Sequence, residues 1–126
     1  KLINKKTKAI VAVHLYGSPC DILSIKKICK EKKIILIEDC AQSLGSKVNK
    51  QHVGTFGDLS IFSFHQQKNM TTLGEGGMLI VNNKKFQKYI PGLRHNGHKQ
   101  YANKKKEKYF LLLSDFKPFP NTIKLT

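Results

Sequence analysis

The chain has 126 residues and a formal net charge of +15, from 23 Lys and Arg residues against 8 Asp and Glu residues. A chain of this length can bury the core of one domain, and no apolar run approaches the roughly 18 residues of a membrane-spanning helix. Its three cysteines form no CxxC pair, which predicts neither a zinc site nor a disulfide framework. We therefore expect no metal, no membrane partner and a reducing, cytoplasmic location.

The positive charge comes almost entirely from lysine. Arg94 is the one arginine, so 22 of the basic residues are lysines, most of them scattered and one run lying at residues 104–106. Proteins that read nucleic acids rely on arginine for bidentate contacts and on aromatic rings for stacking. We interpret the lysines as a solvated surface and predict no nucleic-acid partner. The alternative, a lysine-rich nucleic-acid-binding module, predicts binding that weakens steeply with salt.

The first 39 residues predict a strand, a helix and a second strand. Residues 8–14 form an apolar run that we expect to be a buried strand. Asp21 is a candidate N-cap for the helix that follows. Four consecutive aliphatic residues within 34–39 predict a strand that is covered on both faces, as in parallel sheets. This order predicts a right-handed βαβ unit. The helix is expected to bury one apolar face: Ile22, Ile25, Ile28 and Cys29.

The second half alternates polar loops with short apolar runs. We expect a short helical turn at 41–44, a loop or small hairpin at 45–57, and strands at 59–64 and 78–81. Asn82 and Asn83 are expected to cap a last helix over 84–89, with Pro91 and Gly92 disturbing its end. The lysine-rich stretch 95–108 is expected to be mobile. The tail after it carries apolar residues and prolines and receives no assignment.

Three reactive side chains follow the ends of neighbouring predicted strands. Asp39 closes the strand at 34–39, and Ser63 and Lys68 lie at and after the end of the next strand. In open α/β sheets ligands collect beyond the carboxyl ends of the strands, so these three residues can converge. A lysine for a Schiff base, a carboxylate for a pyridinium and a hydroxyl for a phosphate are the groups that pyridoxal 5′-phosphate (PLP) requires.

Three motifs carry a resemblance to a known family. They are VHLYG at 13–17, EDCAQ at 38–42 and GDLSIFSFHQQKNMTTLGEGGM at 57–78. Together they resemble the DegT/DnrJ/EryC1/StrS nucleotide-sugar aminotransferases. The resemblance implies an α/β fold, the large domain of PLP-dependent transferases of fold type I, with a mixed, mostly parallel sheet flanked by helices. Residues 1–97 would be the central part of this PLP-binding domain, and residues 98–126 a mobile segment and the start of the following region.

The resemblance also implies a role for four residues. Lys68 would hold the cofactor through a Schiff base and move the proton between the cofactor and substrate carbons. Asp39 would keep the pyridine nitrogen protonated, Gln42 would lie beside the ring, and Ser63 would bind the phosphate. Each also has a simpler interpretation: a solvated lysine, a cap for the turn at 41–44, a solvent-facing amide and an ordinary strand hydroxyl. The glycines at 74, 76 and 77 would let the backbone pass close to the lysine turn.

The implied reaction moves an amino group from an amino acid, expected to be glutamate, to a keto group of a nucleotide-linked deoxysugar. The resemblance implies a homodimer and a chain that is part of a longer protein, inactive as these residues alone. One alternative is a pyridoxamine-phosphate-dependent sugar dehydratase of the same family, which would carry histidine where this chain has Lys68. A non-catalytic truncated remnant is another. His14 and His65 are interpreted as packing residues rather than as part of the cavity.

Overall fold

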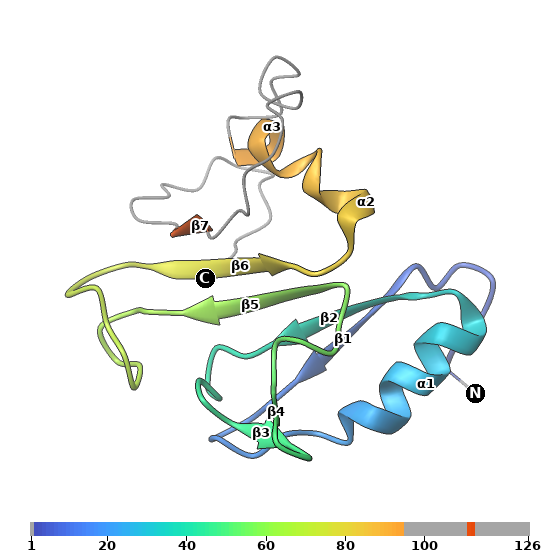
Figure 1. Ribbon diagram of the computed structural model, residues 1–126, viewed down its shortest axis with the longest axis horizontal. Coiled ribbons are helices and arrows are strands. Elements are labelled where there is room, and N and C mark those ends of the chain that lie inside the picture. Colours follow the sequence, from blue (N-terminus) through green and yellow to red (C-terminus); the bar gives the residue numbers. More distant parts are fainter. Residues whose placement is uncertain (1, 95–110, 113–126) are drawn as a thin grey trace.

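The computed structural model describes residues 2–94 and 111–112. Figure 1 shows the helices and strands of these residues. In chain order the elements are β1 (Ala9–Val13), α1 (Ile22–Lys32), β2 (Ile35–Asp39), β3 (Lys47–Val48), β4 (Gln51–His52), β5 (Leu59–Ser63), β6 (Gly77–Val81), α2 (Lys84–Gln87), α3 (Ile90–Arg94) and β7 (Leu111–Leu112).

One five-stranded sheet, in the order β1-β2-β5-β6-β7, forms the centre of the described fold. Strands β1, β2 and β5 are parallel to one another, whereas β6 is antiparallel to β5 and to β7. This confirms the predicted α/β fold with a mixed sheet flanked by helices. Strands β3 and β4 pair with each other as a separate antiparallel hairpin, as predicted for residues 45–57. The described helices include none long and apolar enough to cross a membrane.

Helix α1 begins at the residue that the sequence suggests. The Asp21 side chain accepts a hydrogen bond from the backbone N–H of Ser24 at 3.2 Å, so it is the predicted N-cap. At the other end Lys33 adopts the left-handed conformation, with φ +55°, and stops the helix. Ile22 and Cys29 are buried, but Ile28 is 40% exposed, so its predicted burial is wrong. Ile28 directly precedes Cys29 and therefore lies about 100° around the helix from it.

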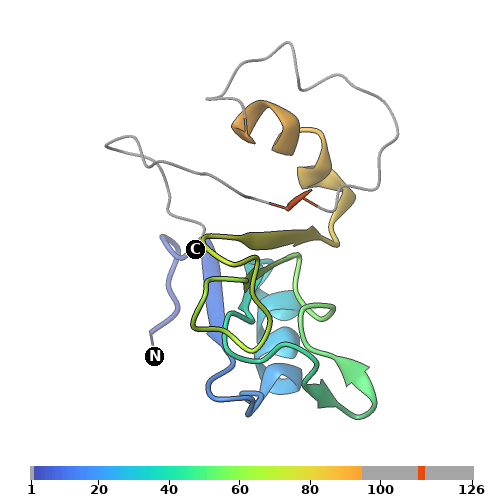
Figure 2. The ribbon, with the colours of Figure 1, turned by 90° about the vertical axis from the view of Figure 1, so that its left-hand side faces the viewer.

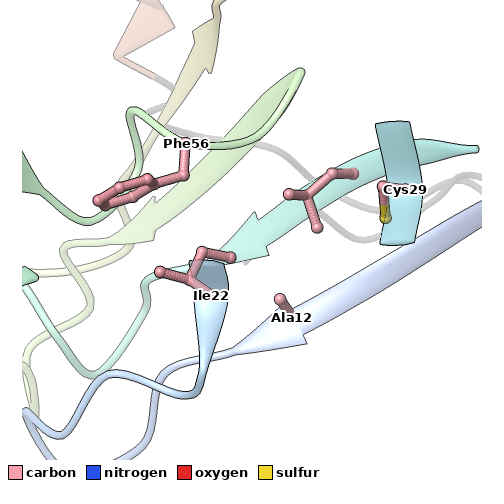
Figure 3. Close-up of a cluster of buried hydrophobic side chains, with 5 residues drawn as sticks. Ala12, Ile22, Cys29 and Phe56 are labelled. Carbon is pink, nitrogen blue, oxygen red and sulfur yellow. The ribbon is translucent and has the colours of Figure 1, made fainter. Parts of the chain in front are cut away.

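The two faces of the sheet differ at β1 and β2. On one face Ala12 and Leu36 pack with Phe56 and with Ile22 and Cys29 of α1, the buried cluster drawn in Figure 3. Helix α1 and the β3–β4 hairpin both lie on this side of the two strands (Figure 2).

On the opposite face Val11 is 57% exposed and Val13 is 49% exposed. Ile37, beside Val11 in the register, is half-buried. The predictions of a buried strand at 8–14 and of a strand at 34–39 covered on both faces are therefore wrong for the part of the chain that the structure describes, because α1 and the β3–β4 hairpin both lie on one side.

The later elements follow the predicted positions with three differences. Residues 41–44 form hydrogen-bonded turns instead of a helical turn. The last helix divides into α2, which Asn83 caps by accepting from Lys85 N–H at 3.0 Å, and α3. Pro91 lies in the first turn of α3, where a missing N–H removes no helical hydrogen bond, so the helix continues instead of breaking. The expectations for residues 95–108 lie outside the described residues, and the unassigned tail contributes β7.

Candidate active site

A cavity of about 450 Å³ lies at the carboxyl ends of β1, β2 and β5. This volume falls in the range of about 300–1,000 Å³ that is typical of small-molecule sites. Three of the four residues predicted for the site, Gln42, Ser63 and Lys68, line it together. The lining residues come from three separate segments: Tyr16, Gly17, Ala41, Gln42, Leu44, Ser63, Gln67, Lys68, Asn69 and Met70.

Lys68 is half-buried on the loop that connects β5 to β6. Its backbone N–H donates to the carbonyl of His65 at 2.9 Å, and His65 also forms an isolated β-bridge with Gly74, which closes the loop on itself. A side chain on Gly76 would collide with the Thr72 side chain, so this glycine permits the close approach that was expected of it. The loop therefore holds the lysine backbone in place while its side chain reaches the cavity.

Ser63 and Gln42 contribute a hydroxyl and an amide to the cavity. Ser63 is the buried last residue of β5, and its Oγ accepts from His65 N–H at 3.4 Å. Gln42 joins two walls, because its side-chain oxygen accepts from Tyr16 N–H at 3.4 Å and its carbonyl accepts from Gly17 N–H at 2.8 Å. The Gln42 side chain is exposed but is not merely directed to solvent.

Asp39 ends β2 beside the cavity and is not among the residues that line it. Its Oδ1 accepts from the backbone N–H of Ala41 at 3.0 Å, which is the capping role considered as its simpler interpretation. No hydrogen bond reaches its Oδ2 from the residues that the structure describes. In the sheet register Asp39 pairs with Val13 and Ile61, so its half-buried side chain lies on the open face.

Sequence reasoning missed part of the cavity wall that follows β1. Tyr16 and Gly17 line the cavity with left-handed backbones, at φ +51° and +78°. For a residue other than glycine such a conformation is uncommon and occurs often at binding sites. Because β1 is parallel to β2 and β5, the rule that placed Asp39 and Ser63 at one edge also applies to the VHLYG motif. Applied there, it would have found Tyr16.

A second group of polar side chains lies under the covered face of the sheet. The ligand atoms of His14, Glu38 and Cys40 fall within 4.8 Å of one another. Burial, and then the charge of Glu38, raise the pKa of the Cys40 thiol to about 12, which opposes the thiolate that a metal needs. Both ring nitrogens of His14 already make hydrogen bonds, to Glu38 and to Cys20. These donors therefore do not favour a metal ion, and His14 is not among the residues that line the cavity.

Comparisons with known proteins agree with the motifs. The family model described as the DegT/DnrJ/EryC1/StrS aminotransferase family matches residues 1–117. GDP-perosamine synthase of Vibrio cholerae is 56% identical over 80 residues, which are 64% of this chain and 22% of that protein. The chain spans about a quarter of the length of the curated relatives that it matches.

Solved structures of similar fold include two kinds of enzyme. The Helicobacter pylori aminotransferase PseC, involved in the biosynthesis of pseudoaminic acid, superposes with a TM-score of 0.69 at 34% identity, over 74% of this chain and 25% of that one. GDP-4-keto-6-deoxymannose-3-dehydratase with a trapped PLP-glutamate geminal diamine superposes with a TM-score of 0.70 at 31% identity, over 85% of this chain and 27% of that one.

Proposed function

The chain belongs to the DegT/DnrJ/EryC1/StrS aminotransferase family, and from this premise we propose that it forms the lysine-bearing part of a PLP-dependent aminotransferase. Its amino donor is glutamate and its acceptor is a keto group on a nucleotide-linked sugar. One observation carries the proposal: Gln42, after β2, lines the same cavity as Ser63 and Lys68, at the end of β5 and in the loop after it. An amine, a hydroxyl and an amide in a cavity of this size fit the functional groups of PLP.

PLP supplies an electron-withdrawing ring that stabilises negative charge on the amino carbon of the substrate. Nζ of Lys68 would hold the cofactor through its carbonyl carbon and would carry a proton between the cofactor and substrate carbons. The backbone of Lys68 is held by its hydrogen bond to the His65 carbonyl. Both roles therefore depend on movement of the flexible Lys68 side chain.

The other predicted residues orient the cofactor in this proposal. Ser63 Oγ donates its proton to the phosphate, because the hydrogen bond that it accepts from His65 N–H leaves its own O–H free to donate. Asp39 uses Oδ2 to hold the ring nitrogen protonated while Oδ1 keeps its bond to Ala41. Gln42 lies beside the ring and links the two loops around it.

A sugar dehydratase is the second candidate, because one similar structure is a dehydratase. The family resemblance places histidine at the lysine position in dehydratases, whereas this chain has Lys68 at a cavity wall. Lys68 therefore favours amino transfer. The proposal also includes a homodimer in the cytoplasm and the assignment of residues 1–97 to the central part of the PLP-binding domain.

The test is the first half of the reaction, which is independent of the sugar. The full-length gene product with stoichiometric PLP is given glutamate, and 2-oxoglutarate is measured over a single turnover. Lys68→Arg keeps the positive charge but removes the nucleophile, so the rate is expected to fall by at least about a hundredfold. Lys47→Arg, on the exposed β3 strand, is the matched control and is expected to behave like the wild type. Equal rates in Lys68→Arg and wild type would overturn the proposal.

A further inference from the structure

A buried carboxylate lies next to the candidate site, on the covered face of the sheet. Glu38, the penultimate residue of β2, is 0% exposed. Its Oε1 accepts from the backbone N–H groups of Phe56 at 2.7 Å and Gly57 at 2.6 Å. Its Oε2 accepts from Gly54 N–H at 2.8 Å and from His14 Nε2 at 3.2 Å. One side chain therefore gathers donors from two other segments.

The hydrogen bonds define the charge state of this group. Nδ1 of His14 accepts from Cys20 N–H at 3.2 Å, so the ring carries its proton on Nε2 and donates it to Glu38. Every partner of Glu38 is then a donor, which requires an ionised carboxylate that only accepts. An ionised carboxylate is tolerated in the interior only when its hydrogen bonds are made, so these four bonds are needed together.

Two glycines let the loop backbone approach this carboxylate. A side chain on Gly57 would place its Cβ 2.8 Å from the carbonyl oxygen of Leu36 and 3.3 Å from Glu38 Cγ. Gly54 has φ +87°, and its Cβ would lie 2.6 Å from the Phe62 ring. The loop before β5 is therefore shaped so that its N–H groups reach Glu38.

Each segment joined at Glu38 continues into a wall of the cavity. His14 is followed by Tyr16 and Gly17, and Glu38 itself is followed by Ala41 and Gln42. The loop 54–57 leads into β5, which ends at the cavity residue Ser63.

We propose that Glu38 is a positioning residue: its carboxylate, with His14, holds the three walls of the Lys68 cavity in register. The proposal rests on the proposed function for what the cavity binds, but not for its geometry. A purely structural role is the rival explanation. In that case losing the carboxylate lowers the stability of the whole fold and leaves the cavity walls unchanged in the folded molecules.

Amide hydrogen exchange by NMR separates the two explanations. Glu38→Gln keeps the shape but turns an NH₂ group toward two N–H donors, and Glu31→Gln, exposed on α1, is the matched control. Gly54 N–H reports the bond to Glu38, and Gly17 N–H, which donates to the Gln42 carbonyl, reports a cavity wall. Ile34 N–H, which donates to the Cys29 carbonyl, reports the opposite end of the sheet.

In Glu38→Gln, exchange at Gly54 and Gly17 is expected to rise by about ten- to a hundredfold more than at Ile34, because local openings become easier. His14→Ala removes only the hydrogen bond that His14, the residue after β1, donates to Glu38. In this variant amide exchange at Gly17 is expected to increase more than at Ile34, while exchange at Gly54 stays close to that at Ile34. The His14 variant makes the same comparison if Glu38→Gln does not fold. An equal rise at all three amides, as global unfolding produces, would overturn the positioning role.

A second readout distinguishes this proposal from the proposed function. PLP is offered to the wild type and to folded Glu38→Gln, and borohydride fixes any cofactor bound to lysine. The expected result is less adduct on Lys68 in the variant, with equal adduct on exposed lysines. A wild type without adduct on Lys68 contradicts the proposed function but leaves the amide comparison intact. Equal Lys68 adduct in both proteins contradicts the positioning role alone.

Discussion

The two faces of the sheet at β1 and β2 differ in what they do. On the covered face Ala12 and Leu36 are almost completely buried against α1 and the loop before β5. On the open face Val11 and Val13 are about half exposed, and Asp39, which pairs with Val13, lies on the same face. Apolar burial thus stabilises one side, while the other side and the carboxyl edge leave polar groups accessible. The carboxyl ends of the same strands carry the candidate site, and Asp39 lies on the open face beside it.

Two neighbouring acids show this contrast most directly. Glu38 faces the covered side and accepts four hydrogen bonds, whereas Asp39 faces the open side and accepts one, from Ala41. Because side chains alternate along a strand, adjacent residues of the same charge have opposite surroundings. Glu38 is therefore expected to matter for stability and geometry, and Asp39 for the cofactor.

The largest expected effect is the loss of the Glu38 carboxylate. Glu38→Ala leaves four donors without an acceptor, so the free energy of unfolding is expected to fall by about 3–5 kcal/mol. Asp39→Ala removes one hydrogen bond of a half-buried group and is expected to cost about 0.5–1.5 kcal/mol. Urea unfolding followed by circular dichroism measures both. Equal losses would remove the contrast between the two acids.

Apolar side chains on the two faces are expected to differ in the same direction. Phe56 is buried in the cluster between α1 and the sheet, so Phe56→Ala is expected to lower the free energy of unfolding by about 3–5 kcal/mol. Val11→Ala, on the open face, is expected to change it by no more than about 0.5 kcal/mol. Thermal unfolding of the two variants provides the comparison. A large loss in Val11→Ala would mean that this face is covered in the protein in solution.

Asp39→Asn is expected to have little effect on stability but a clear effect on PLP binding. Asparagine can still accept from Ala41 N–H, so the unfolding free energy is expected to stay within about 0.5 kcal/mol of the wild type. The charge proposed to pair with the cofactor ring is lost, so the affinity for PLP is expected to fall at least about tenfold. Titration of PLP by absorbance measures this. Asp21→Asn is the control, because asparagine caps helices as well as aspartate does. Unchanged PLP affinity in Asp39→Asn would contradict its role.

Thiol chemistry is expected to show the smallest and most local difference. Burial raises the pKa values of all three cysteines, and that of Cys40 to about 12. Alkylation is therefore expected to be slowest at Cys40 and to speed up as the pH rises. Cys20, which is only partly buried, is expected to react first. Mass mapping after iodoacetamide treatment gives the order, and Cys40 reacting first would contradict the burial of the covered face.

The order of elements could be predicted from the sequence because each has a local signal. Asp21 and Asn83 mark helix starts, and the aliphatic run in β2 marks a central parallel strand. The one-sided burial of β1 and β2 could not be predicted. An aliphatic run places apolar side chains on both faces of a strand and does not show which face other elements cover. Ile28 was wrongly predicted to be buried. Four apolar residues of α1 were assigned to one helical face, but only three of them face the sheet.

The candidate site was predicted in the same uneven way. Lys68 and Ser63 line one cavity as their positions at strand ends suggested, Gln42 lines it as the resemblance implied, and Asp39 lies next to it. Glu38 received no role, because a motif shows that two acids are adjacent but not that loop donors from residues 54–57 surround one of them. Those contacts depend on a loop whose path only the three-dimensional structure reveals. The roles of these residues toward PLP stay predictions.

The most direct test of the account is to locate the covalent attachment of PLP. The full-length gene product is incubated with PLP, reduced with borohydride and digested, and the modified peptides are identified by mass spectrometry. The account predicts a pyridoxyl group on Lys68 at near-stoichiometric yield, with trace labelling of the other lysines, and no such peptide in Lys68→Arg. Labelling spread evenly over the lysines of a folded protein, with Lys68 no more modified than Lys47, would contradict it.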